Sequence, residues 1–178
     1  MTLPAHLSGS YLGFILVDKV HPEFGFNTDG LLITGILGSI FPDVDFFFSK
    51  YVKDHHDSLL HSPLFWLVIY IFIYGFCVII GYDALKNYIS AFIIGVSIHF
   101  FLDWYSARTA GIRVFYPFSK KRYSLFPLNP QKGKIVPKIF PTREYAKFFK
   151  FYMENKFLLI SEISLIVVGI IVFILNAI

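Results

Sequence analysis

The sequence predicts an all-α integral membrane protein, and three observations support this fold class. Hydrophobic residues make up 56% of the 178 residues and charged residues only 16%, with a mean hydropathy of +0.62, whereas a soluble domain needs more surface charge. Several apolar segments approach the roughly 20 residues that a helix needs to cross a bilayer. Phe (22) and Tyr (11) are frequent, as is typical of helix packing and of the membrane–water boundary.

The first apolar segments, residues 7–17 and 31–48, predict a helical hairpin over residues 5–48. The polar connection between them contains Pro22 and Gly25, which break helices, and Thr28 or Asp29 is suited to cap the second helix. Both helices are short for full spans. We therefore expect this hairpin to be embedded fully or partly in the membrane.

Three later segments predict full spans. Residues 63–82 contain no charged residue, and residues 88–105 are apolar except for His99 and Asp103. The link at 83–87 is short, so these two segments predict an antiparallel transmembrane hairpin over residues 63–105. Residues 157–178 contain Glu162 as their only charged residue and predict a C-terminal transmembrane helix.

The segment 106–156 is basic, with 12 of the 16 Lys and Arg residues. Its prolines predict an extended loop, followed by an amphipathic interfacial helix at 142–155 whose aromatic side is formed by Tyr145, Phe148, Phe149 and Tyr152. Cationic loops stay in the cytoplasm. We therefore expect a single membrane domain, 1–178, in the inner or plasma membrane, with this loop on the cytoplasmic side.

The cysteine count, the N-terminal sequence and the distribution of basic residues exclude some alternatives. The single cysteine, Cys77, excludes an intrachain disulfide and a cysteine-rich zinc site. The N-terminus lacks the basic start of a signal peptide, and we expect it to be retained. Basic residues with aromatics also suit nucleic acid, but the positive-inside rule already accounts for this charge, so no clear nucleic-acid partner is predicted.

Histidine and aspartate residues recur at one end of both hairpins. His56 and His61 precede the second hairpin and His99 and Asp103 end it, while His6 opens the first and Asp43 and Asp45 lie near its end. A hairpin brings its first and last residues together. The spacing therefore predicts that all seven converge at the cytoplasmic face, with His99 and Asp103, four apart, on one helix face.

Imidazole with carboxylate is a ligand set typical of zinc, manganese or iron. We expect a divalent metal, zinc before the other two, and one or two ions, because seven candidates exceed the four ligands of one zinc. Simpler roles compete: His6 or Asp45 as a helix or turn cap, and His55 as an exposed neighbour of His56. Ionisable residues inside a membrane segment, such as His99 and Asp103, are costly and usually functional.

These residues resemble the YdjM-like family, whose members are described as membrane-bound, metal-dependent hydrolases. The resemblance covers residues 6–118 and rests on an ordered set of elements: His6, Pro42-Asp43-Val44-Asp45, His56 with His61-Ser62, His99 with Asp103, Gly111 and Tyr116-Pro117-Phe118. One position departs from the family pattern, because Asp57 stands where an Arg commonly follows the first His of its element.

The resemblance implies a metal-dependent hydrolase, and the ligand style is similar to that of zinc-dependent phospholipase C and P1-type nucleases. We expect phosphoester hydrolysis of an anionic small-molecule or lipid-linked substrate, with Asp45 and Asp103 as catalytic carboxylates. The substrate anion would be bound by the cations that follow the last ligand: Arg108, Arg113, Lys120, Lys121 and Arg122. The alternative is a structural or sensory metal site, with the basic loop docking membrane lipid or a partner.

Overall fold

The computed structural model describes residues 2–26, 28–48, 58–106, 111–126, 153 and 156–177, without the side chains of residues 29, 45–48 and 106. The described part is helical and contains no strand, which confirms the predicted fold class. Its main helices are α1 (Leu3–Val20), α2 (Asp29–Ile40), α3 (Pro63–Ile80), α4 (Asp83–Ser106) and α6 (Lys156–Ala177). Three short 3-10 helices accompany them: η1 (Pro22–Phe24), η2 (Phe41–Phe48) and η4 (Leu59–His61).

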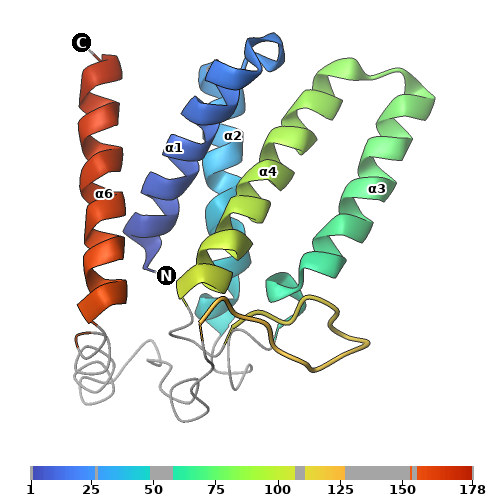
Figure 1. Ribbon diagram of the computed structural model, residues 1–178. Helices are drawn as coiled ribbons and strands as arrows, with labels where there is room; N and C mark the ends of the chain where they lie inside the picture. The colour runs from blue at the N-terminus through green and yellow to red at the C-terminus, as the bar shows by residue number, and fades with distance from the viewer. Residues whose placement is uncertain are drawn as a thin grey trace.

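The helices stand side by side in one bundle (Figure 1). α1, α2 and α4 form its centre, α3 flanks α4 on one side, and α6 flanks α1 on the other. The chain begins at the lower end of α1, and the ends of α2 and α4 and the start of α3 lie at the same end. The histidine and aspartate residues of both hairpins are thus delivered to one end of the bundle.

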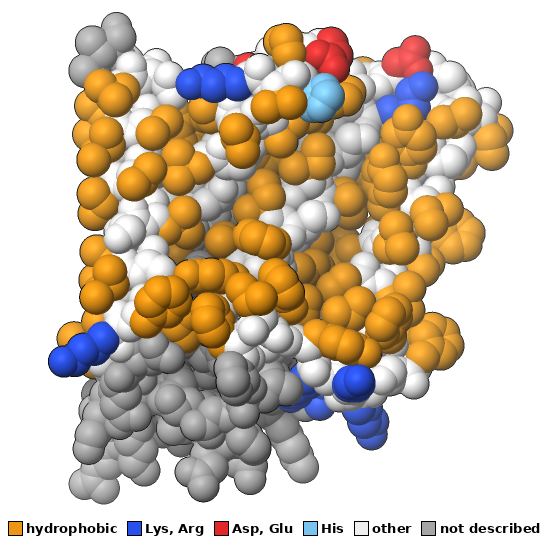
Figure 2. All heavy atoms as spheres, in the orientation of Figure 1, with side chains coloured by type: hydrophobic (Ala, Val, Ile, Leu, Met, Phe, Trp, Pro, Cys, Tyr) orange, Lys and Arg blue, Asp and Glu red, His pale blue; other side chains and the backbone are white. Residues whose placement is uncertain are grey.

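Three helices are long and apolar enough to cross a membrane: α3, α4 and α6. Their outward side chains are apolar and exposed, as for Phe72 (74%) and Ile79 (84%). Figure 2 shows hydrophobic side chains over the middle of the bundle, with charged residues near its two ends. This surface suits a lipid environment, since monomeric soluble proteins rarely expose such an apolar area.

α1 runs from Leu3 to Val20 and is longer than the predicted segment 7–17. Two further boundaries differ from the predicted ones. α4 begins at Asp83, where the sequence predicted a link over 83–87, because Asp83 and Lys86 pair within the first turn and an acid there favours a helix start. α2 ends at Ile40 rather than continuing to residue 48, and η2 follows through Pro42, which has no N–H to donate to the helix. The predicted interfacial helix at 142–155 lies outside the described residues, except Met153.

α2 and α4 pack backbone against backbone. A Cβ added at Gly95 would lie 1.8 Å from the carbonyl oxygen of Gly35, and one at Gly38 would lie 2.1 Å from that of Phe92. Small residues allow this close approach, which is the usual way for helices to associate within a membrane. The contact fixes the second half of α2 against the middle of α4.

We predict that Gly95→Ala destabilises the protein by roughly 1–3 kcal/mol, because the added methyl group forces α2 and α4 apart. The matched control is Gly75→Ala in α3, where an added Cβ meets nothing within 4 Å. Thermal unfolding in detergent measures the difference. Equal melting temperatures for the two variants would contradict the close contact.

Candidate metal centre

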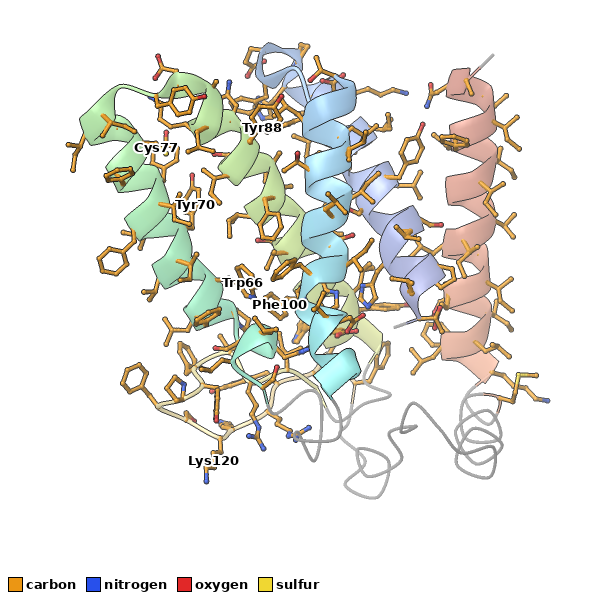
Figure 3. All side chains as sticks on the ribbon, turned by 180° about the vertical axis from the view of Figure 1, so that it is seen from behind. Trp66, Tyr70, Cys77, Tyr88, Phe100 and Lys120 are labelled. Atoms are coloured by element: carbon orange, nitrogen blue, oxygen red, sulfur yellow. The ribbon has the colours of Figure 1, made fainter. Side chains whose placement is uncertain are left out.

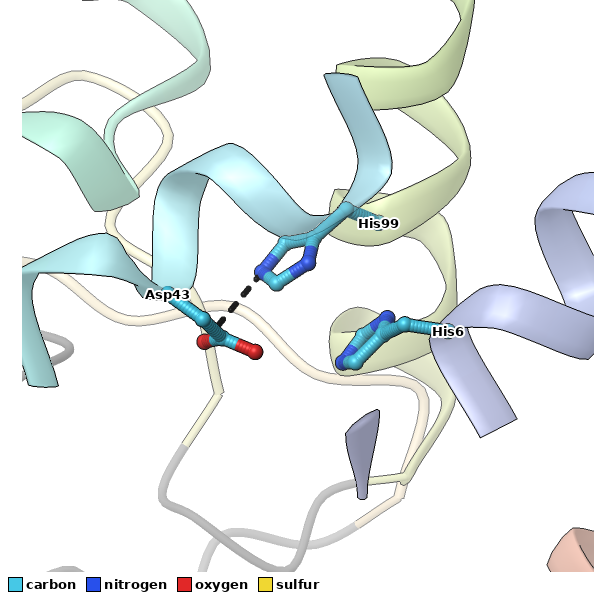
Figure 4. A group of neighbouring side chains, drawn as sticks. All are labelled: His6, Asp43 and His99. Atoms are coloured by element: carbon cyan, nitrogen blue, oxygen red, sulfur yellow. Dashed lines mark ion pairs between the residues drawn. The ribbon is translucent and has the colours of Figure 1, made fainter. Parts of the chain in front are cut away.

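Three imidazoles and two carboxylates meet at the end of the bundle where the chain begins. His6 comes from the first turns of α1, Asp43 from η2, His61 from η4, and His99 and Asp103 from the end of α4. Their potential ligand atoms form two overlapping groups, each within 4.8 Å: His6, Asp43 and His99, and His61, His99 and Asp103. Figure 4 shows the first group, in which the His99 ring lies between Asp43 and His6.

Each imidazole Nε2 lies close to a carboxylate oxygen. Asp103 contacts two rings, His6 through Oδ1 at 3.3 Å and His99 through Oδ2 at 3.3 Å. Asp43 Oδ1 lies 3.2 Å from Nε2 of His61 and 3.8 Å from Nε2 of His99. The rings of His6 and His99 also stack, with centroids 4.0 Å apart. All five side chains therefore form one connected cluster.

The tautomer of His99 follows from its backbone partner. Its Nδ1 lies 2.8 Å from the carbonyl oxygen of Ser39 in α2. A carbonyl only accepts, so Nδ1 carries a hydrogen, and Nε2 is the ring nitrogen that faces the two carboxylates. A histidine that donates its second ring N–H to a carbonyl is the usual arrangement of a metal ligand.

The atom separations fit a divalent metal. Two ligand atoms about 2.0–2.2 Å from a tetrahedral zinc ion lie about 3.3–3.6 Å from each other, and the four Nε2–carboxylate separations are 3.2–3.8 Å. Among the described residues, both ring nitrogens of His6 and Nε2 of His99 are buried without a hydrogen bond. A buried polar nitrogen is costly unless it has a partner, and a cation would supply one to each Nε2.

Burial differs within the cluster. The side chains of His6, His61, His99 and Asp103 are at most 2% exposed, whereas that of Asp43 is 23% exposed. Access from water to the cluster is therefore on the Asp43 side. The other four side chains are enclosed within the bundle.

Residues 111–126 run across the underside of this end of the bundle, and we call this segment the strap (Figures 1 and 3). Ser62, the N-cap of α3, donates its hydroxyl to the carbonyl of Tyr116 at 2.7 Å, and the N–H of Leu125 donates to the carbonyl of Trp104 at 2.9 Å. Ile112 packs with Trp66 and Phe100 in one apolar cluster. The strap thus fixes the chain on both sides of the centre, directly after His61 and after Asp103.

The structure brings together five of the seven predicted ligands: His6, Asp43, His61, His99 and Asp103. Asp45 lies in η2, but its side chain is outside the described part of the chain, as are His55, His56 and Asp57 altogether. His21 lies at the opposite end of α1, exposed and 2.9 Å from Glu23.

The predicted substrate-binding cations are described in part. Ile112 and Tyr123 form an isolated antiparallel bridge with both hydrogen bonds made, and Arg113 and Arg122 are the residues next to it in the strap. Both are half-buried, whereas Lys120 and Lys121 are exposed, and Figure 3 shows Lys120 at the bottom of the molecule. Arg108 lies outside the described residues.

The sequence analysis assigned no role to two groups that contact residues of the centre or the N-cap of α1. The carbonyl of Ser39 orients His99, and no residue pattern marks a carbonyl. Glu162, which is 1% exposed, accepts a hydrogen bond from the backbone of Thr2. A single acid within an apolar span was a visible signal for it.

Comparison with known proteins assigns the chain to a family. The family described as YdjM inner membrane protein matches residues 1–177, which is nearly the whole chain. Neither the curated proteins nor the solved structures give a match. The match agrees with the three apolar helices and with the ordered His and Asp elements that the structure brings to one end. The chain is therefore a membrane protein that belongs to the YdjM inner membrane protein family.

Proposed function

We propose that the chain is a metal-dependent hydrolase that cleaves a phosphoester, on an anionic small molecule or a lipid-linked substrate, at the cytoplasmic membrane face. One observation carries this proposal: three imidazole Nε2 atoms and two carboxylates, from four separate elements, lie at ligand-to-ligand separations in a buried cluster. Lone ionisable residues in an apolar bundle are costly, and five together indicate a common cation.

The chemistry of the donor set favours zinc over manganese and iron, with one or two ions. His6, Asp43, His61, His99 and Asp103 would hold the metal, and Asp45 and His56 stay predicted ligands from the neighbouring segment. A divalent ion in such a site supplies Lewis acidity, which makes water a competent nucleophile near neutral pH.

The protein residues have separate tasks in the reaction. A carboxylate, Asp103 or Asp45, would accept a proton from the attacking water as the new phosphorus–oxygen bond forms. The ester phosphorus–oxygen bond breaks, and the same proton passes to the departing alkoxide, so that the products are the alcohol and the phosphate. Ser39 keeps the His99 ring in one orientation through the reaction. The partly exposed side of Asp43 is where a substrate phosphate reaches the centre.

The cations of the strap would hold the substrate anion. Arg113 and Arg122 are half-buried in the strap, and a guanidinium can bind a phosphate through two parallel hydrogen bonds. Lys120 and Lys121 are exposed beside them, and Arg108 precedes the strap. The described cations of the strap bring positive charge to the end of the bundle that bears the metal centre, where a lipid headgroup or a soluble phosphoester would approach.

A structural or sensory metal site is the second candidate, because four of the five residues are almost fully buried. A structural site is closed and saturated by protein ligands, whereas a catalytic site keeps one open position. In this alternative the basic loop docks anionic lipid or a partner. The 23% exposure of Asp43 favours the catalytic site.

Metal content tests the centre. We predict that the protein purified in detergent contains a divalent metal, and that His61→Ala and His99→Ala each lose it together with phosphoesterase activity, because each removes a ligand. The control is His21→Ala at the opposite end of α1, which should change neither. Elemental analysis and hydrolysis of a chromogenic phosphodiester provide the readouts. Full metal occupancy in both ligand variants would refute the proposal, and full occupancy without hydrolysis in wild type would favour the structural alternative.

Substrate binding by the strap has its own kinetic test. We predict that Arg113→Gln and Arg122→Gln raise KM for an anionic phosphoester about tenfold each, since a hydrogen bond to a charged group contributes about 1.5–3 kcal/mol, and leave metal content unchanged. Lys120→Gln, exposed at the bottom of the strap, should have little effect on KM. Loss of metal in either Arg variant would mean that the strap acts structurally.

Orientation is tested by labelling single cysteines in a Cys77→Ser background. A membrane-impermeant maleimide should label Lys120→Cys in inverted membrane vesicles but not in intact cells, because the basic segment lies in the cytoplasm. Glu23→Cys, exposed at the other end of the bundle, should show the opposite pattern. Labelling of Lys120→Cys in intact cells would show that the basic segment lies outside the cytoplasm, opposite to the predicted topology.

A further inference from the structure

α6 contributes no residue to the cluster of three imidazoles and two carboxylates, yet it buries a carboxyl group. Glu162 lies within a span of mean hydropathy 2.9 and is 1% exposed. An ionisable side chain at such a position is costly unless it is hydrogen-bonded, and it usually has a function. The metal centre and the reaction proposed above do not use it.

Glu162 holds the first residue of the described chain. The backbone N–H of Thr2 donates to its Oε1 at 2.7 Å, and the Thr2 hydroxyl donates to the same oxygen. Thr2 is the N-cap of α1, where a threonine hydroxyl ordinarily accepts from a helix N–H. Here the side chain makes no capping hydrogen bond, because its hydroxyl is directed to α6 instead.

The same Thr2 is joined to His6 through the first helical turn. Its carbonyl accepts from the N–H of Ala5 at 3.0 Å and from the N–H of His6 at 3.1 Å. His6 in turn lies 3.3 Å from Asp103 and stacks on His99. A chain of direct contacts thus runs from Glu162 through Thr2 to His6 and into the metal centre.

α6 is held in register along α1 by contacts spaced seven residues apart. Beyond Glu162, Gly169 approaches Ser8 so closely that an added Cβ would lie 2.6 Å from the Ser8 Cβ. Seven residues further, Asn176 Nδ2 donates to the hydroxyl of Tyr11 at 3.2 Å. Such a spacing keeps one side of a helix on its partner. Of these three contacts, the one made by Glu162 lies at the end that bears the metal centre.

We propose that Glu162 is a positioning residue for the metal centre: it fixes the N-cap of α1 and thereby sets the position of His6 Nε2. This inference rests on the proposed metal site. In this proposal α6 positions a ligand of the metal centre, although it contributes no ligand itself. Residues that orient metal ligands typically affect metal affinity by about 10–100-fold when removed.

Cobalt(II) binding tests the proposal, because the visible spectrum of bound cobalt reports the geometry of its ligands. Full-length metal-free protein in detergent is titrated with cobalt(II). Glu162→Ala should bind at least about tenfold more weakly and with an altered spectrum. Glu162→Gln keeps an oxygen that accepts from Thr2, and should restore both. The matched control is Asn176→Ala, which removes a polar contact at the far end of the same helix pair and should leave affinity and spectrum unchanged.

If Glu162→Ala does not fold, a second pair of variants tests the same hydrogen bond from the Thr2 side. Thr2→Val removes the hydroxyl that donates to Glu162 and should weaken cobalt binding and alter the spectrum, whereas Thr2→Ser should match wild type. Wild-type affinity and spectrum in folded Glu162→Ala, or in Thr2→Val, would overturn the positioning role while the metal site stands. An equal effect from Asn176→Ala would also overturn it, and a wild-type protein that binds no cobalt would overturn both proposals.

Discussion

The close approach of α2 and α4 is the constraint on which the candidate centre depends. Gly35, Gly38 and Gly95 let the two backbones touch, and this contact brings the Ser39 carbonyl within 2.8 Å of His99. It also fixes where η2 leaves α2, and hence where Asp43 lies relative to α4. In a bundle whose outer surface is apolar, tight backbone packing supplies the precision that a soluble protein obtains from a large buried core.

The imidazoles and carboxylates of the centre face one another. Asp103 contacts two imidazoles and Asp43 contacts two, with His99 shared between them. Removing a partner from such a network leaves a buried polar group whose desolvation is no longer offset, and a single loss therefore affects every member. Nε2 of His6 and Nε2 of His99 are buried in this cluster without a hydrogen bond, and a cation at its middle would give each of them a partner.

The sequence predicted the main architecture because hydropathy and hairpin geometry act locally. Apolar stretches located α3, α4 and α6, and the four-residue spacing of His99 and Asp103 placed both on one helix face. The convergence of His6 and Asp43 with them followed from pairing the ends of two hairpins. Predicting this convergence required only the order of the helical segments along the chain.

Other features depend on contacts that no local pattern records. The start of α4 at Asp83 was misjudged because a polar stretch at the membrane surface can be either a link or a first helical turn. The carbonyl of Ser39 is a backbone group like any other, and only the packing of α2 on α4 selects it. Glu162 was conspicuous, but its partner lies 160 positions away, so no spacing rule connects the two.

That separation has a consequence for the biogenesis of the protein. The hydrogen bonds of Thr2 to Glu162 join α1 to α6, so they form only after α6 has been synthesised and inserted. Contacts between residues so distant in sequence are the slowest to form. The N-cap of α1 therefore lacks these hydrogen bonds while the two hairpins assemble, and it gains them only when α6 inserts beside it.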